Sequence, residues 1–163
     1  WHHSKLKLQV EYMLKNKKNF VFSNYYLLKG NKKFKSGYLS LFREGYVTQS
    51  LLDNYWLGIL TVLMKKKLFK KRKFNQNYEI IGDFDFFVNL SINNYFGYVE
   101  KPLAFYRVHN NNFSQIKIDL WIKELKSWIE KNSERFIKRG FNLSKQKKYI
   151  YKLKIKNFFN YIN

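Results

Sequence analysis

The stretch that decides the fold covers residues 78–114 and reads YEIIGDFDFFVNLSINNYFGYVEKPLAFYRVHNNNFS. Gly82 opens an apolar run that predicts a helix over about 83–94. The aromatic and β-branched residues after it predict a strand or a hairpin around 97–107, turned at Glu100-Lys101-Pro102 and followed by a polar asparagine loop. A helix that leads into a strand in this way indicates an α/β fold.

The sequence before this stretch predicts the same alternation. Leu6, Val10, Met13 and Leu14 recur at the spacing of one helical face, and Ser4 is placed to cap that helix. The other expected elements are a buried strand over 20–28, a helix over 47–57, a strand over 59–64, and a basic stretch over 65–73 that we interpret as a solvated loop or helix face.

Two amphipathic helices are expected after the stretch. The first has apolar residues from Ile118 to Ile129 at helical spacing and ends near Arg139-Gly140. The second, with Ser144 as its cap, carries an apolar face flanked by lysines. We favour docking of this last helix on the core, and the alternative is a helix that lies on an acidic membrane surface. Its apolar face comprises Tyr151, Ile155, Phe158, Phe159 and Ile162.

Composition narrows the class of protein. Hydrophobic residues make up 45% of the chain, which excludes a disordered tail, and the absence of cysteine excludes disulfides and thiolate metal sites. No apolar run approaches the roughly 20 residues that a membrane span needs. The net charge of +21 favours contact with nucleic acid or an acidic membrane. A genome rich in A and T would also produce this charge. The abundant residue types, which are lysine, asparagine, phenylalanine, tyrosine and isoleucine, all have codons made only of A and T.

Two carboxylates stand out because their neighbours are apolar. Asp83 and Asp85 lie within IIGDFDFFV, where a buried carboxylate is costly unless it is paired or hydrogen-bonded. Capping of the helix by Asp83 would explain them. A general base held in a partly dry cleft is the alternative explanation, which spacing alone favours less, and both interpretations stay open at this point.

Arg107 and His109 form a second candidate group. On a strand they would point to the same side, where an arginine and a histidine can hold a diphosphate, with the histidine as a donor or a metal ligand. A lone histidine is more often structural. The sequence contains no glycine-rich phosphate loop, no His-Glu-x-x-His motif and no nucleophilic serine elbow.

Three stretches together resemble the family-2 inverting glycosyltransferases, which have the GT-A fold. They are residues 1–10 (WHHSKLKLQV), 61–69 (TVLMKKKLF) and the long motif over 80–114. The resemblance implies that Asp83 is the general base, that Gly82, Asp85 and Arg107 bind substrate, and that His109 is a metal ligand near the diphosphate. Family members more often carry Glu-Asp where this chain has Gly82-Asp83.

The resemblance also implies that the chain is one part of a larger enzyme. Members carry an Asp-x-Asp motif, which binds Mg²⁺ or Mn²⁺, just before the tryptophan that matches Trp1. We therefore expect residues 1–115 to be the acceptor-side half of a GT-A domain without its nucleotide-binding half, and 116–163 to be a helical extension.

The expected function is transfer of a sugar from a nucleotide-sugar donor, with inversion, to a glycan or lipid-linked acceptor during the synthesis of a bacterial envelope polysaccharide. The expected location is the cytoplasm, with peripheral contact at the acidic inner face of the membrane. The alternatives are a basic, aromatic-rich nucleic-acid-binding module, which we consider a weaker hypothesis, and a remnant without catalytic activity.

Overall fold

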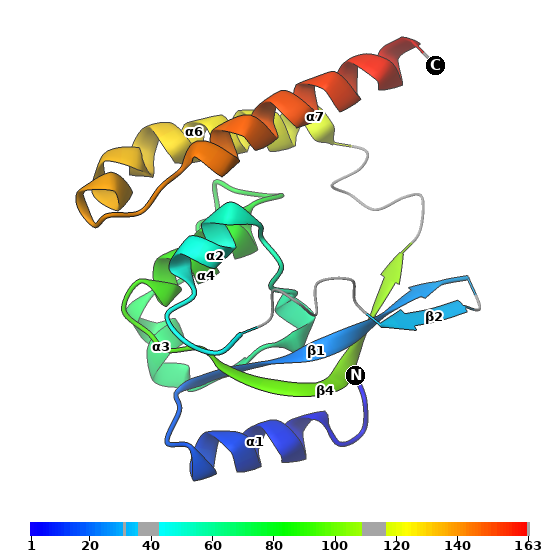
Figure 1. Cartoon of the computed structure of the whole chain (residues 1–163), viewed down its shortest axis with the longest axis vertical. Helices are drawn as coiled ribbons and strands as arrows, with labels where there is room; N and C mark the ends of the chain where they lie inside the picture. The colour runs from blue at the N-terminus through cyan, green and yellow to red at the C-terminus, as the bar shows by residue number, and fades with distance from the viewer. Residues whose placement is uncertain (31, 36–42, 109–116, 163) are drawn as a thin grey trace. The chain divides into compact units, whose positions relative to one another are not determined.

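The computed structural model describes residues 1–30, 32–35, 43–108 and 117–162, and shows a mixed α/β fold (Figure 1). This confirms the α/β class. The elements are, in chain order, α1 (Lys5–Lys15), β1 (Phe20–Lys29), β2 (Lys32–Lys35), α2 (Thr48–Asp53), the 3₁₀ turn η2 (Ile59–Thr61), β3 (Leu63–Met64), α3 (Lys66–Lys71), α4 (Gly82–Ser91), β4 (Gly97–Val108), α6 (Ile118–Lys138) and α7 (Ser144–Ile162).

The chain forms two compact units, which we describe separately. Unit 1 contains the sheet and α1, and unit 2 contains α2, α6, α7 and the start of α4. The units interleave along the sequence, whereas a single boundary near residue 115 was expected. Unit 1 comprises Trp1–Val47, Trp56–Lys73 and Asn89–His109, and unit 2 comprises Thr48–Tyr55, Phe74–Val88 and Asn110–Asn163.

Strand β1 is the centre of the sheet in unit 1. Strand β4 runs parallel to it from Val21↔Gly97 to Lys29↔Val108. Because β4 occupies one edge of β1 along this length, β2 and β3 share the other edge, end to end and both antiparallel to β1. The first six residues of β1 are buried, which is the pattern of a strand covered on both faces.

Strand β4 resolves the choice between strand and hairpin, because Gly97–Val108 form a single strand. Glu100 and Lys101, where a turn was expected, instead lie at an irregularity in the pairing: Ser23 pairs with Val99 and Asn24 with Pro102. The irregularity accommodates the proline within the strand. The strand expected over 59–64 is shorter than predicted, since its first half is η2 and only Leu63–Met64 are extended.

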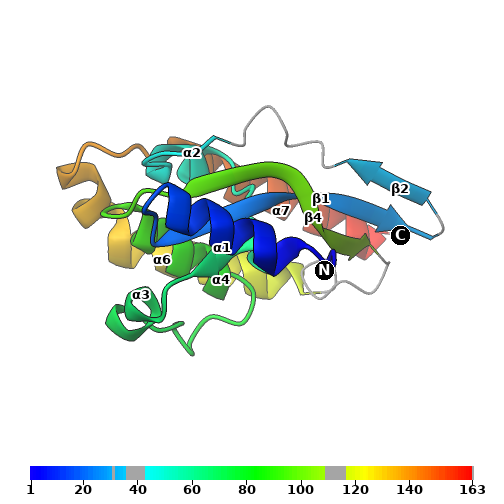
Figure 2. The ribbon, with the colours of Figure 1, turned by 90° about the horizontal axis from the view of Figure 1, so that it is seen from below.

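Helix α1 packs along β1 and β4, as Figures 1 and 2 show, but with a different face from the predicted one. Leu6, Val10 and Leu14 are exposed, and the buried residues are Lys5, Gln9 and Met13. Gln9 donates to the Thr61 carbonyl at 2.7 Å, and Lys5 Nζ donates to Gln9 Oε1 at 2.6 Å. The predicted helix is therefore confirmed, but of the four apolar residues that share a face only Met13 is buried, because hydrogen bonding decides which side of this helix is covered.

The predicted caps differ from the observed ones. The Ser4 side chain makes no capping bond to α1 and lies 2.7 Å from His2 Nδ1 instead. Ser144 is the first residue of α7, and its N–H donates to Asn142 Oδ1 at 2.7 Å. Ser4 therefore holds the predicted N-cap position of α1 without a side-chain capping bond, and at the start of α7 the side chain of Asn142 accepts the N–H of the serine that was predicted to be the cap.

Helix α6 agrees with its prediction. Ile118, Ile122, Leu125, Trp128 and Ile129 are all buried. The helix ends at Lys138, and Gly140 takes a φ of +82°, which allows the chain to reverse. None of the helices in the described part of the chain has an apolar run that would cross a bilayer.

Candidate functional site

The candidate site in unit 2 is the start of helix α4. The N–H of Asp85 donates to the Ile81 carbonyl at 2.8 Å, so the first helical turn begins at Ile81 and includes Gly82 and Asp83. Asp83 Oδ1 accepts the N–H of Phe84 at 2.7 Å. The carboxylate thus meets the amide end of the helix, where the helix dipole favours negative charge. This is the contact that the capping interpretation predicted.

Asp83 is partly buried and faces Tyr55. Burial raises the pKa of the Asp83 carboxyl above its ordinary value, while the Phe84 N–H and the neighbouring Tyr55 hydroxyl lower it. Burial, and then the Asp83 charge, raise the pKa of the Tyr55 hydroxyl well above its ordinary value. With Asp83 as its neighbour, this hydroxyl finds no hydrogen bond of regular geometry among the described residues. Tyr55 therefore remains a protonated donor beside the carboxyl.

Gly82 leaves open space next to Asp83. A Cβ atom built on Gly82 would meet no described atom within 4 Å. Neither close packing nor a positive φ requires glycine here, since Gly82 takes ordinary helical geometry. Glycine at this position therefore leaves unfilled space one residue before Asp83.

Asp85 has a different environment from Asp83, although only one residue separates them. Its side chain is 3% exposed, and Oδ1 accepts the indole N–H of Trp128 in α6 at 2.8 Å. The Trp128 ring packs edge-on against Phe84, with 4.8 Å between ring centroids. In this structure Asp85 joins α4 to α6 inside unit 2.

Glu124 is a site residue that the sequence analysis missed. It is 5% exposed in α6, and its two carboxylate oxygens accept the backbone N–H groups of Glu79, Ile80 and Ile81 at 2.8, 3.0 and 3.1 Å. Three successive amides that converge on one carboxylate fix the segment before α4. A signal was present, because Glu124 lies on the side of the helix that carries Trp121, Leu125 and Trp128. Tyr55 gave no comparable signal.

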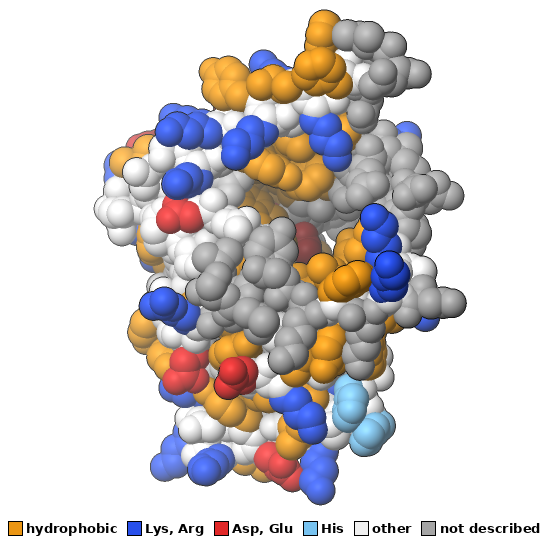
Figure 3. All heavy atoms as spheres, turned by 45° about the vertical axis from the view of Figure 1, so that its right-hand side comes forward, with side chains coloured by type: hydrophobic (Ala, Val, Ile, Leu, Met, Phe, Trp, Pro, Cys, Tyr) orange, Lys and Arg blue, Asp and Glu red, His pale blue; other side chains and the backbone are white. Residues whose placement is uncertain are grey.

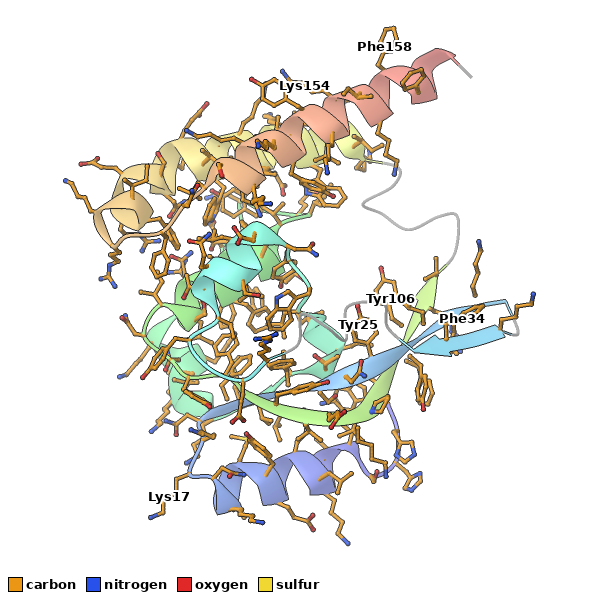
Figure 4. All side chains as sticks on the ribbon, in the orientation of Figure 1. Lys17, Tyr25, Phe34, Tyr106, Lys154 and Phe158 are labelled. Carbon is orange, nitrogen blue, oxygen red and sulfur yellow. The ribbon has the colours of Figure 1, made fainter. Side chains whose placement is uncertain are left out.

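Arg107 lies in unit 1, near the end of β4, with an exposed side chain opposite Leu28 of β1. Its neighbour Tyr106 meets Tyr25 of β1 edge-on, with 6.4 Å between ring centroids, and Figure 4 shows both tyrosines on the same side of the sheet. His109 lies outside the described residues. Gly82, Asp83 and Asp85 are therefore brought together in unit 2, and Arg107 is placed separately in unit 1.

The described residues do not form a site for a divalent ion. Among them, no three histidine, cysteine or carboxylate side chains lie close enough to hold a metal. The carboxylates near α4 accept N–H groups instead: Asp83 from the backbone, Asp85 from an indole and Glu124 from three amides. Comparison of the chain with protein-family models, curated proteins and solved structures finds no match.

Proposed function

We propose that this chain is the acceptor-side part of an inverting glycosyltransferase with a partial GT-A fold, and that Asp83 is its general base. The observation that carries the proposal is the contrast between two carboxylates in one helical turn. Asp85 is buried and bound to Trp128, whereas Asp83 is partly exposed, lies beside open space at Gly82, and has a raised pKa. A carboxyl in such surroundings is a suitable proton acceptor.

In the proposed reaction, Asp83 takes the proton of an acceptor hydroxyl as the hydroxyl oxygen attacks the anomeric carbon of the donor sugar. The new glycosidic bond forms as the bond to the diphosphate breaks, and the electron pair leaves with the nucleoside diphosphate. Tyr55 would orient the carboxyl, since its hydroxyl is buried beside Asp83. Glu124 and Asp85 would hold the backbone of the site in place.

The other expected roles belong to the donor side. Arg107 and His109 would compensate the charge of the diphosphate. The nucleotide-binding half would bind the donor together with Mg²⁺ or Mn²⁺, whereas the proton transfer to Asp83 uses only residues of this chain. The acceptor would be a glycan or a lipid-linked sugar at the cytoplasmic face of the membrane.

The test uses the complete natural protein that contains this chain, and measures nucleoside diphosphate release with a panel of sugar donors and acceptors. Asp83→Asn should lower kcat by roughly 10²- to 10⁴-fold, which is the usual contribution of a general base. Asp53→Asn is the matched control, because Asp53 is exposed and its Oδ1 contact with Gln49 at 2.8 Å survives the change. Near-normal turnover of the Asp83 variant would remove the assignment.

The pH dependence gives a second measurement. Because the pKa of Asp83 is raised in the folded protein, the folded state holds this proton more tightly than the unfolded state. Its contribution to stability is therefore present below the unfolded pKa and is lost as the pH rises through the folded pKa. We expect Asp83→Asn to remove this loss and to be more stable than the parent at neutral pH, whereas activity of the parent should fall as acid protonates Asp83.

A binding experiment, combined with the transfer assay, tests the alternative that this chain binds nucleic acid. Salt-dependent binding of single-stranded DNA or RNA by this chain, together with no transfer activity in the complete protein, would favour it.

A further inference from the structure

Helix α7 has one face that packs within unit 2. Gln146, Ile150 and Leu153 are buried, and Gln146 Nε2 donates to the Leu52 carbonyl of α2 at 2.6 Å. Tyr149 meets Trp121 of α6 edge-on, with 5.6 Å between ring centroids, and Asn157 donates to Asp119 of α6 at 2.7 Å. These contacts fix the rotation of the helix, and therefore determine which residues face outward.

The opposite face carries a row of exposed apolar side chains. Tyr151, Ile155 and Phe158 are 66%, 59% and 63% exposed, and their i, i+4, i+7 spacing places them on one side of the helix. Figure 4 shows Phe158 projecting away from the rest of unit 2. We call these three residues the α7 stripe. Phe159, next to Phe158, is 58% exposed.

Lysines border the α7 stripe on both sides. At 100° per residue, Lys147 and Lys154 lie along one border and Lys148 and Lys152 lie along the other, with Lys145 and Lys156 further round the helix on that side. Their side chains are exposed, and residues 144–162 contain no aspartate or glutamate. Figure 3 shows hydrophobic and basic side chains next to each other at the α7 end of unit 2. The face is thus apolar along its middle and positive along its borders.

We propose that this face of α7 lies on a bilayer surface that contains acidic lipids. The α7 stripe would enter the boundary between head groups and acyl chains, where apolar side chains are removed from water, while the bordering lysines meet the lipid phosphates. A planar, negatively charged surface fits an apolar row with positive charge on both borders. The proposal goes beyond the transferase activity and does not depend on it.

Two other partners fit less well. Single-stranded nucleic acid needs flat rings on which bases can stack, and the middle of the α7 stripe is the aliphatic side chain of Ile155. A second copy of the same face would bring two sets of lysines together without a carboxylate between them. The aliphatic middle of the α7 stripe and its positive borders together therefore favour the acidic bilayer.

The test is sedimentation of the full chain with vesicles of phosphatidylcholine alone or with phosphatidylglycerol added. The parent should bind the acidic vesicles much more tightly than the neutral ones. Ile155→Asp combined with Phe158→Asp should weaken this binding at least tenfold. Ile137→Asp is the matched control, because Ile137 is 57% exposed on α6 of the same unit, and it should bind like the parent.

The lysines are tested separately at low salt. Lys148→Gln with Lys152→Gln should weaken binding to acidic vesicles about fivefold for each lysine removed. The same exchanges at Lys123 and Lys131, which are exposed on α6, should have less effect. These neutral substitutions keep the α7 stripe intact, so they test the proposal even if the double aspartate variant fails to fold by circular dichroism.

Three results would overturn the proposal. The first is equal binding to neutral and acidic vesicles. The second is loss of binding in the Ile137 variant as large as in the α7 stripe variant. The third is retained vesicle binding by the α7 stripe variant while its mass in sedimentation velocity falls from dimer to monomer, because the stripe would then hold two copies together. Each result is independent of the Asp83 assay, so failure here leaves the transferase proposal standing.

Discussion

Helices α1 and α6 bury different kinds of side chain, although both carry apolar residues at helical spacing. Helix α6 buries its apolar side and α1 exposes Leu6, Val10 and Leu14 while burying Lys5 and Gln9. The difference lies in what each helix faces. Helix α6 packs against aromatic rings such as Phe84, whereas α1 faces the Thr61 and Val62 carbonyls, which need donors. Apolar spacing therefore predicts burial only where the facing surface is apolar.

The two helices end in the same way with different residues. In each, the chain closes with the bonds of a Schellman motif: Lys18 N–H to the Met13 carbonyl at 3.0 Å in α1, and Phe141 N–H to the Phe136 carbonyl at 3.0 Å in α6. The left-handed position is Gly140 in α6, with φ +82°, and Lys17 in α1, with φ +50°. The end of α1 therefore contains strain that the end of α6 avoids.

The largest expected effect is in α6. Trp128 is completely buried, with its ring against Phe84 and its indole N–H bound to Asp85. Trp128→Ala should lower the free energy of unfolding by about 3–5 kcal/mol, because it creates a cavity and also leaves a buried carboxylate without its donor. Urea titration measures this loss of stability. Trp1→Ala is the control, because Trp1 is 70% exposed and its replacement should change the free energy of unfolding little.

A smaller but clear effect is expected from the polar face of α1. Gln9 is fully buried, and Gln9→Ala removes the donor to the Thr61 carbonyl and the acceptor for Lys5. The variant should have a free energy of unfolding lower by about 2 kcal/mol, which is within the usual range for buried polar groups left without partners. Glu11→Ala, on the exposed side of the same helix, is the comparison. If the two variants unfold alike, our explanation for the burial of Lys5 and Gln9 is wrong.

The helix ends should respond in opposite directions. Lys17→Gly should stabilise the protein by about 1 kcal/mol, because glycine adopts the left-handed conformation without strain. Gly140→Lys should destabilise it by about the same amount, and the cause would be conformational, since a Cβ there meets no described atom within 4 Å. Thermal unfolding of the two variants and the parent measures both changes in stability. If both variants are less stable than the parent, the explanation from left-handed backbone strain is wrong.

The smallest effect should come from the apolar residues of α1 that share a helical face but are exposed. Leu6→Gln, Val10→Thr and Leu14→Gln change side chains that are 50%, 44% and 71% exposed. Each should alter stability by less than about 0.5 kcal/mol. A loss above 2 kcal/mol for any of them, measured by urea titration, would mean that this side of α1 is covered in solution.

The sequence predicted the existence of most elements better than their contacts. The α/β class, β1, α4 and α6 follow from local patterns of apolar and β-branched residues. What could not be predicted depends on distant partners. The side of α1 that is buried is decided by carbonyls more than 50 positions away in the chain, as the Gln9 bond to Thr61 shows (|i−j| = 52). The pairing of β4 with β1, which decides between strand and hairpin, is likewise long-range.

The candidate site, like the fold, could be predicted from the sequence only in part. Asp83 and Asp85 were visible because charged residues are conspicuous among apolar ones, but the sequence could not distinguish their surroundings. The distinction comes from Trp128, 43 positions after Asp85, and from Tyr55, whose hydroxyl reaches Asp83 from another segment. These distant contacts decide which of the two neighbouring carboxylates is partly exposed and which is held by an indole.

The amide contacts of Glu124 make the C-terminal region part of the machinery around Asp83. A protein shortened after residue 115 would lose Glu124 and Trp128 together, so the N–H groups of Glu79, Ile80 and Ile81 and the Asp85 carboxylate would all lose partners at once. Helix α6 therefore cannot be trimmed as a dispensable tail.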